Sequence, residues 1–225
     1  MLQLPLLFAL LLGGGRVLCE ELRINNTDDF INFSNNVNSG TNYKGVTVLL
    51  DSDIDLSGRT FEPIGNETNS FLGIFDGQGY TISNFVINST SQFVGLFGYS
   101  EGTTIKNVVM DFSCSITSSF VTDSYDNAYV GGIIGYCYSR SNSCIIQNII
   151  NMASVSFKGI VDNKMYLGGI VGYLYSRGDE FRILLTNCAN YGPVSHVGES
   201  DIPHIGGIVG CHEEYRLTPN GLVKK

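Results

Sequence analysis

The stretch GGIIG at residues 131–135 returns as GGIVG at 168–172 and at 206–210, and a related VGLFG lies at 94–98. The final glycines of the four stretches are Gly98, Gly135, Gly172 and Gly210, so the steps between them are 37, 37 and 38 residues. Repetition at a fixed period of this length is typical of repeat architectures, in which a unit too small for its own core packs against its neighbours.

A second element keeps the same period. An apolar residue, one variable residue and an asparagine follow the first three glycine stretches, with the asparagines at Asn107, Asn148 and Asn187. In the last two copies another asparagine follows three residues later, at Asn151 and Asn190, and then a Val-Ser pair. We therefore expect three short apolar runs in every unit.

These runs favour strands over helices. They are only four to seven residues long and are separated by Gly, Asn, Ser or Asp. The chain has 27 glycines among 225 residues, no Trp, and only 15% charged residues, a composition that suits turns and pleated surfaces. The sequence predicts an all-β solenoid, with Ile and Val in inward columns and Asn in hydrogen-bonded ladders at the bends.

An N-terminal cap is predicted over residues 20–45, ahead of a solenoid over 46–225. The cap should contain one helix with Thr27 as its N-terminal capping residue and Gly40 as its terminator. The apolar residues of this stretch fall on one helical face: Phe30, Phe33 and Val37. At the other end, LTPNGLVKK resembles the beginning of another coil, which predicts a solenoid that is truncated or uncapped at its C-terminal end.

The first 19 residues are predicted to be a cleaved signal peptide, because an apolar run from Leu2 to Leu12 precedes small residues and two glutamates. No later apolar run reaches the ~18 residues needed to span a bilayer. We therefore expect a secreted or cell-surface chain without a transmembrane segment. Four Asn-x-Ser/Thr triplets are candidate N-glycosylation sites: Asn25, Asn32, Asn66 and Asn88.

Net charge and cysteine content bear on the expected partner and on disulfide formation. The net charge is −8, and no segment gathers Lys and Arg into a patch, so nucleic acid is not an expected partner. Five cysteines remain after residue 19, without zinc spacing. Cys137 and Cys144 flank one loop and are the candidate disulfide.

The motifs resemble a known family. GLFG at 95–98, the GGIIG and GGIVG stretches and TNCANYGPVS at 186–195 are similar to GLUG-type repeats, found in large secreted and surface proteins that include bacterial adhesin-like proteins and IgA-specific metallopeptidases. Residues 37–87 are similar to the segment that commonly precedes those repeats. The resemblance covers about residues 22 to 215 and implies a right-handed parallel β-helix that serves as a stalk or display surface, without catalysis by the repeats.

Peptidase activity does not carry over with this resemblance. A family peptidase would need a zinc helix of the form HExxH, and the similar stretch that begins at His212 has Arg216 in place of the second histidine. The expected function is therefore non-catalytic: adhesion, ligand display or structural spacing.

One candidate ligand strip repeats with the period. GYCYSR at 135–140 matches GYLYSR at 172–177, which places two sets of side chains in register: Tyr136, Tyr138 and Arg140, and Tyr173, Tyr175 and Arg177. Tyrosines and guanidinium groups stack on sugars and dominate many protein contacts. The predicted partner is a glycan or a host or cell-surface protein, and the alternative is an inherited element that only packs coil on coil. No cofactor is predicted.

A carbohydrate-active β-helix enzyme, of lyase or hydrolase type, is the alternative function. FDGQGYTI at 75–82 resembles an early coil of such enzymes, and glycoside hydrolysis generally needs two carboxylates about 5 to 9.5 Å apart. Convergence of Asp76 and Asp111, for example, would favour the enzyme. The histidines have no Ser or Cys at a recognisable spacing and are interpreted as surface or loop residues: His196, His204 and His212.

The stretch DSDIDLSGRTFE at 51–62 has the carboxylate spacing of a calcium loop. Its acidic residues are Asp51, Asp53, Asp55 and Glu62. Position six of such a loop requires Gly and is Leu56 here, and helical flanks are missing. Because Ile54 and Leu56 alternate with the aspartates, a half-buried strand is predicted instead, with no metal site.

Overall fold

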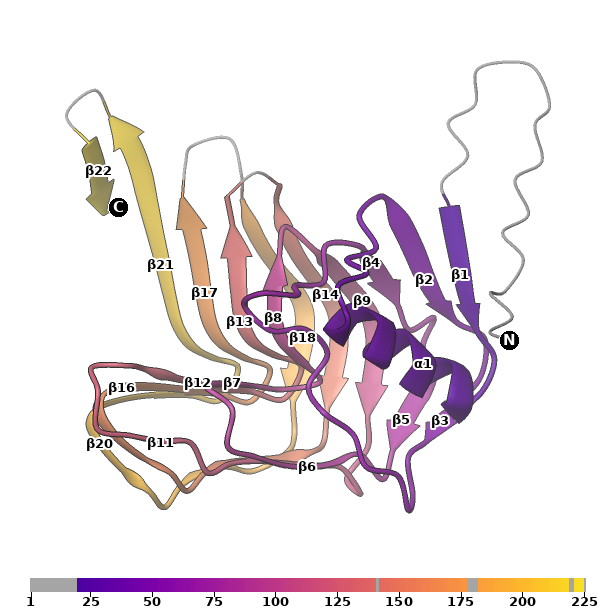
Figure 1. Ribbon diagram of the computed structural model, residues 1–225, viewed down its shortest axis with the longest axis horizontal. Coiled ribbons are helices and arrows are strands. Elements are labelled where there is room, and N and C mark those ends of the chain that lie inside the picture. Colours follow the sequence, from indigo (N-terminus) through magenta and orange to yellow (C-terminus); the bar gives the residue numbers. More distant parts are fainter. Residues whose placement is uncertain (1–19, 141, 178–181, 219–220, 225) are drawn as a thin grey trace.

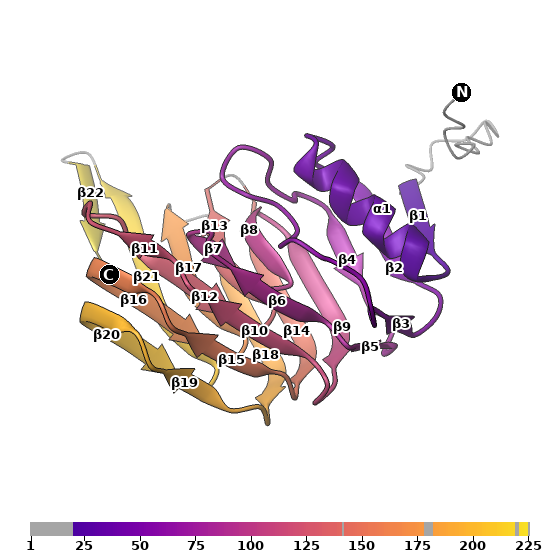
Figure 2. The ribbon, with the colours of Figure 1, turned by 60° about the horizontal axis from the view of Figure 1, so that its bottom comes forward.

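The computed structural model describes residues 20–140, 142–177, 182–218 and 221–224. In this part of the chain a single helix accompanies strands that wind through four sheets in a fixed order, coil after coil (Figure 1, Figure 2). The predicted all-β parallel solenoid with a short N-terminal helix is confirmed. The predicted signal peptide lies outside the described residues.

We number the sheets in the order in which the chain enters them. Sheet 1 contains β1 (Glu20–Ile24), β2 (Val46–Leu50), β3 (Ile54–Asp55), β4 (Ile74–Asp76), β5 (Thr81–Ser83), β9 (Thr104–Met110), β14 (Cys144–Asn151) and β18 (Ile183–Asn190). Sheet 2 contains β6 (Val86–Ser89), β10 (Ser115–Ser118), β15 (Ser154–Phe157) and β19 (Val194–His196). Sheet 3 contains β7 (Phe93–Val94), β11 (Val121–Thr122), β12 (Ala128–Gly131), β16 (Ile160–Gly168) and β20 (Glu199–Gly206). Sheet 4 contains β8 (Phe97–Glu101), β13 (Ile134–Ser139), β17 (Val171–Arg177), β21 (Val209–Thr218) and β22 (Gly221–Lys224).

Strand register follows the sequence period. Equivalent residues of successive units are parallel partners, as in the pairs Ile146 with Leu185, Val155 with Val194 and Ile134 with Val171. One repeat is therefore one coil.

The glycine stretches form the corner between sheets 3 and 4, and this corner is concave toward solvent (Figure 1). On the corner's inner side, Val130 of β12 and Cys137 of β13 are fully buried, whereas their outward neighbours Tyr129 and Tyr136 touch each other across the angle. A Cβ atom on Gly131 would clash with the carbonyl oxygen of Ile134, and one on Gly135 would lie 2.9 Å from the carbonyl oxygen of Tyr129. Only glycine lets the two strands approach this closely.

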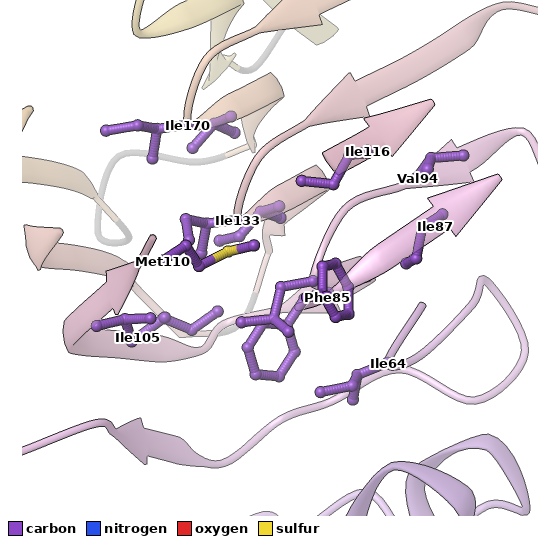
Figure 3. Close-up of a cluster of buried hydrophobic side chains, with 14 of the residues drawn as sticks. Ile64, Phe85, Ile87, Val94, Ile105, Met110, Ile116, Ile133 and Ile170 are labelled. Carbon is purple, nitrogen blue, oxygen red and sulfur yellow. The ribbon is translucent and has the colours of Figure 1, made fainter. Parts of the chain in front are cut away.

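The core is one continuous apolar cluster that runs along the solenoid. Figure 3 shows side chains from different sheets meeting in it. Those drawn include Ile105 and Met110 of β9, Ile87 of β6, Ile116 of β10 and Val94 of β7. Because these strands are too short to bury a core alone, the stacked columns supply the burial that stabilises each coil.

Helix α1 (Thr27–Asn38) covers the core at the N-terminal end, as predicted (Figure 2). Phe30 stacks on Phe61 with ring centroids 5.4 Å apart, and Phe33 packs against Phe71 at 5.6 Å. The cap residue is Asn26 and not the predicted Thr27, because the Asn26 side chain accepts a hydrogen bond from the Asp29 backbone N–H at 2.9 Å.

Further strands flank the regular coils at both ends of the described chain. Before the helix, β1 pairs parallel with β2, so sheet 1 begins within the residues of the predicted cap. At the other end, β22 pairs antiparallel with β21.

Asparagine ladders link the coils, as predicted. Asn187 donates to Asn148, Asn148 to Asn107 and Asn107 to Asp76, at 3.2, 2.8 and 2.8 Å. The three asparagines have φ between 51° and 55°, the left-handed region that Asn tolerates well. In a second ladder, the fully buried Asn151 donates to Asn190 at 2.9 Å.

The corner generates a stability prediction. Gly131→Ala should lower the free energy of unfolding by about 1–3 kcal/mol, because the new methyl group overpacks a backbone crossing. The matched control is Gly207→Ala, since no atom lies within 4 Å of the Cβ position at Gly207, the equivalent of Gly132 two coils later. Urea unfolding of both variants measures the difference, and an equal effect of the two substitutions would contradict the steric explanation.

Candidate functional site

Two rows of aromatic side chains line the concave corner. The sheet 3 row consists of Phe93, Tyr129, Tyr166 and His204, whose neighbouring rings stack at 5.2, 5.3 and 4.9 Å with interplanar angles of 9° to 11°. The sheet 4 row consists of Tyr99, Tyr136 and Tyr173, with rings 5.0 and 5.3 Å apart. Successive rings come from strands one coil apart, so each row is a direct product of the register. Tyr138 and Tyr175 continue the outward face of sheet 4 beyond Tyr136 and Tyr173. We call the two rows and this pair together the aromatic corner.

The rows also touch each other. Tyr129 meets Tyr136 edge to face at 4.9 Å, and Phe93 meets Tyr99 in the same way at 5.3 Å. Edge-to-face contacts match the positive ring edge to the negative ring face. The result is a rigid double row whose hydroxyl groups and ring edges line the angle between sheets 3 and 4.

The four tyrosines of the predicted ligand strip lie in this corner. Tyr136 pairs in register with Tyr173, and Tyr138 with Tyr175, as the sequence predicts, and the rings of the second pair are 5.2 Å apart. The described register ends at Ser139 with Ser176, so the arginines do not extend it. Arg140 and Arg177 are exposed.

Tyr173 is not the exposed residue that the strip would need. Its side chain is only 7% exposed, because the ring of Tyr166 lies 4.5 Å away and the carboxylate of Glu213 accepts a hydrogen bond from its hydroxyl group. Tyr136, Tyr138 and Tyr175 remain partly exposed.

The sheet 3 row is absent from the sequence predictions, although the sequence contains a signal for it. An aromatic residue or histidine stands two positions before a glycine in each unit: Phe93, Tyr129, Tyr166 and His204, before Gly95, Gly131, Gly168 and Gly206. Its significance depends on the concave corner, which periodicity alone does not reveal.

A cleft of 240 Å³ lies at the N-terminal end of the aromatic corner. Its lining combines four aromatic and three polar residues: Glu67, Gln92, Phe93, Tyr99, Asp126, Tyr129 and Tyr136. Glu67 comes from the long segment between β3 and β4, whereas Asp126 precedes β12. Two carboxylates therefore face the same ring edges from separate parts of the chain.

Burial keeps the corner's phenols protonated. Desolvation is the largest cause that raises the pKa of Tyr99, Tyr136 and Tyr173. Nearby negative charge adds to it, since Glu101 and Glu67 further raise the pKa of Tyr99. These hydroxyl groups consequently act as neutral hydrogen-bonding groups at physiological pH.

A second, wider cleft of 430 Å³ lies over the first asparagine ladder on sheet 1. Its lining contains one carboxylate and several amides: Asp76, Gln78, Gly79, Asn107, Val109, Asn148 and Ile150. Burial opposes ionisation of Asp76, but hydrogen bonds from Asn107 and the Gln78 backbone N–H, together with Lys106, lower its pKa overall. The Asp76 carboxylate is thus already bonded within the protein.

The second carboxylate that would favour an enzyme is missing from that cleft. Asp111 follows the other end of β9, where it accepts hydrogen bonds from the backbone N–H and hydroxyl group of Ser113. Asp76 and Asp111 therefore do not line a shared cleft.

The aspartates of residues 51–62 serve as hydrogen-bond acceptors between coils. Asp51 accepts from Arg23 and Gln78, and Asp53 accepts from the Thr81 backbone N–H at 2.8 Å. The strand itself is only two residues long, but Ile54 and Leu56 are buried as predicted. Hydrogen bonds from Asn84 and Ser57 lower the pKa of Asp55.

Among the described residues, the histidines and the possible metal ligands do not form a further candidate site. His204 belongs to the sheet 3 row, His196 packs against Phe157 with centroids 5.8 Å apart, and His212 is exposed. Across the described residues, no three His, Cys, Asp or Glu side chains group in a way that could hold a metal ion.

The predicted modification sites are accessible. All four sequon asparagines are exposed, namely Asn25, Asn32, Asn66 and Asn88. Asn66 directly precedes Glu67 of the small cleft.

Cys137 and Cys144 face each other across the buried junction of β13 and β14. Both are free thiols in the structure, with the Sγ atoms 2.6 Å apart. Burial raises the pKa of Cys137, and the hydrogen bond from Cys137 lowers the pKa of Cys144. The predicted disulfide stays a prediction that this proximity favours.

Comparisons with known proteins agree with the fold and leave the family open. No family model matches the chain. A protein of Evansella cellulosilytica named "Putative Gly-rich membrane protein" is 35% identical over 103 residues, which span 42% of this chain and 11% of that protein. In the part of the chain that the structure describes, no helix is long and apolar enough to cross a membrane.

One solved structure is similar over most of the chain. It is the crystal structure of a "putative immunoglobulin A1 protease" from Bacteroides ovatus, with a TM-score of 0.52 and 20% identity over 84% of this chain and 61% of that chain. A likeness at this identity shows a shared solenoid fold.

Alkaline titration should reveal the buried phenols. Because burial raises their pKa in the folded state, the stabilisation is fully present below the ordinary tyrosine pKa of about 10 and is lost as the pH rises above it. We expect the Tm to fall between pH 9 and 11, and to fall less steeply in Tyr136→Phe. Tyr191→Phe is the control, since Tyr191 is 75% exposed. Identical slopes for both variants and the wild type would contradict this account.

Oxidation should link Cys137 to Cys144. The bond would close a loop of eight residues, which stabilises the fold by about 2 kcal/mol. Mass spectrometry after alkylation in denaturant without reductant should find both thiols protected, and reductant should lower the Tm of the wild type but not of the double variant Cys137→Ala, Cys144→Ala. Alkylation of both cysteines in the untreated protein would show that the pair stays reduced.

Proposed function

We propose that this chain is a secreted or surface-displayed, non-catalytic solenoid of GLUG-type repeats that binds a partner through the aromatic corner. The observation that carries the proposal is the outward position of the two rows. Aromatic side chains usually contribute to stability from the core, whereas Phe93, Tyr99, Tyr129 and Tyr136 face outward and stay partly exposed. Tyrosine offers a large, rigid contact area with a hydroxyl group at low entropic cost.

Sequence features and one relative support display at the cell surface or outside the cell. The predicted signal peptide, the exposed sequons and the glycine-rich relative described as a membrane protein all favour that location. A solenoid also supports the role mechanically, because each coil contacts only its neighbours and the corner repeats with every coil.

A polysaccharide-cleaving enzyme is the second candidate, and one observation favours it. Glu67 and Asp126 line the same cleft, as a pair of catalytic carboxylates would. No Lys, Arg or His belongs to that lining. Release of reducing ends or unsaturated sugars from a polysaccharide panel by the wild type, abolished in Glu67→Gln, would establish this second function.

The binding proposal is tested with a glycan array and an array of immobilised extracellular proteins. The double variant Tyr138→Ala, Tyr175→Ala should lose at least tenfold in signal on the array features that the wild type binds, because a handful of aromatic contacts dominates many interfaces. The control removes two tyrosines outside the corner, Tyr80→Ala and Tyr191→Ala, which are 37% and 75% exposed. Unchanged binding of the first variant would overturn the corner as the binding surface.

A further inference from the structure

The cleft at the N-terminal end of the aromatic corner is small. At 240 Å³ it lies below the range of about 300–1,000 Å³ that is usual for pockets of whole small molecules. A single side chain of a partner fits such a volume. Its lining places acidic and aromatic groups together, which restricts the chemistry of that side chain.

The charged side chains that line the cleft are acidic. Glu67 and Asp126 line it, and Glu101 lies close enough to raise the pKa of Tyr99. The basic residues of the described ion pairs, Arg23, Arg59 and Lys106, do not line the cleft. Neither does Lys164, whose backbone N–H donates to Asn127 beside Asp126. Arg177 acts on Tyr175, one coil away from Tyr138, and does not line the cleft.

Several hydrogen-bonding groups of the cleft have no partner within the described residues. They are the Glu67 carboxylate and the hydroxyl groups of Tyr99 and Tyr136. In contrast, Asp126 accepts from Ser124 at 3.0 Å and the Tyr129 hydroxyl group accepts from Asn127 at 3.0 Å. The cleft thus presents a free carboxylate beside free phenol groups.

Ring geometry argues against a sugar in this position. Sugars stack on open ring faces, but Phe93 covers Tyr129 at 5.2 Å and Tyr99 covers Tyr136 at 5.0 Å, with interplanar angles of 9° and 10°. Ring edges and hydroxyl groups remain for a ligand. A sulfated or sialylated glycan would in addition meet like charge at Glu67 and Asp126.

We propose that this cleft takes the guanidinium group of an arginine in a basic segment of a partner protein. A guanidinium group is planar, offers five donors and binds carboxylates bidentately, so it can donate to Glu67 or Asp126 and direct its remaining N–H groups to the phenol oxygens of the cleft. This inference rests on the proposed function, since it names the partner class of the same corner.

The test uses the full chain and a fluorescein-labelled peptide of alternating arginine and glycine, read by fluorescence anisotropy. The wild type should bind it, and the peptide with glutamate in place of arginine should not bind. Glu67→Gln and Asp126→Asn should each weaken binding about tenfold, because each substitution removes a charge-assisted hydrogen-bond acceptor. Raising the salt concentration should weaken binding by screening.

Glu62→Gln is the matched control. Glu62 lies in the same segment as Glu67, is exposed and does not line the cleft, and its substitution changes the net charge by the same amount. Equal weakening by Glu62→Gln and Glu67→Gln would show unspecific attraction to an acidic protein and overturn the inference.

Two further outcomes separate this inference from the proposed function. Binding of a neutral oligosaccharide that depends on Tyr138 and Tyr175, without binding of the arginine peptide, would overturn the arginine site and leave the corner as a glycan surface. Peptide binding that survives Tyr138→Ala, Tyr175→Ala but not Glu67→Gln would confirm the cleft and confine recognition to it.

Discussion

The backbone crossing at the glycine stretches is the constraint on which the rest of this structure depends. Gly131 and Gly135 stand where sheets 3 and 4 meet, and a side chain at either position would collide with the backbone of the opposite strand. Because the chain can bend back on itself there, the outer faces of two sheets turn toward each other. A convex bend would direct Tyr129 and Tyr136 apart, and the double aromatic row would not exist.

Polar groups inside and between coils depend on the same stacking. Asn151 is fully buried, yet its amide donates to the Gly169 carbonyl oxygen at 2.7 Å as well as to Asn190. Asp53 and Asp55 likewise meet donors from the next coil. Buried or half-buried polar groups are tolerated because the repeat supplies a partner one coil away, which also explains why a chain with few charged residues contains so much asparagine.

Much of the fold could be predicted from the sequence because one period governs it. Gly135 to Gly172 gives the length of a coil, and the 3.6-residue pattern of Phe30, Phe33 and Val37 gives the helix. The direction of the bend could not be predicted, since glycine permits several. Periodicity therefore identified Tyr136 and Tyr173 as neighbours, but it could not show that Tyr166 of sheet 3 would bury Tyr173. The cleft itself depends on Glu67, which lies outside the repeats.

The concave corner also has an evolutionary consequence. Each of the units that contain Tyr136 and Tyr173 contributes one ring to each row, so a tandem duplication of such a unit would lengthen the recognition surface. Additional repeat units can raise the affinity of such a surface for its partner, since extra contact points on one rigid scaffold act at high effective concentration. Recombination between similar units could then change the length of the recognition surface faster than point mutations could create new contacts.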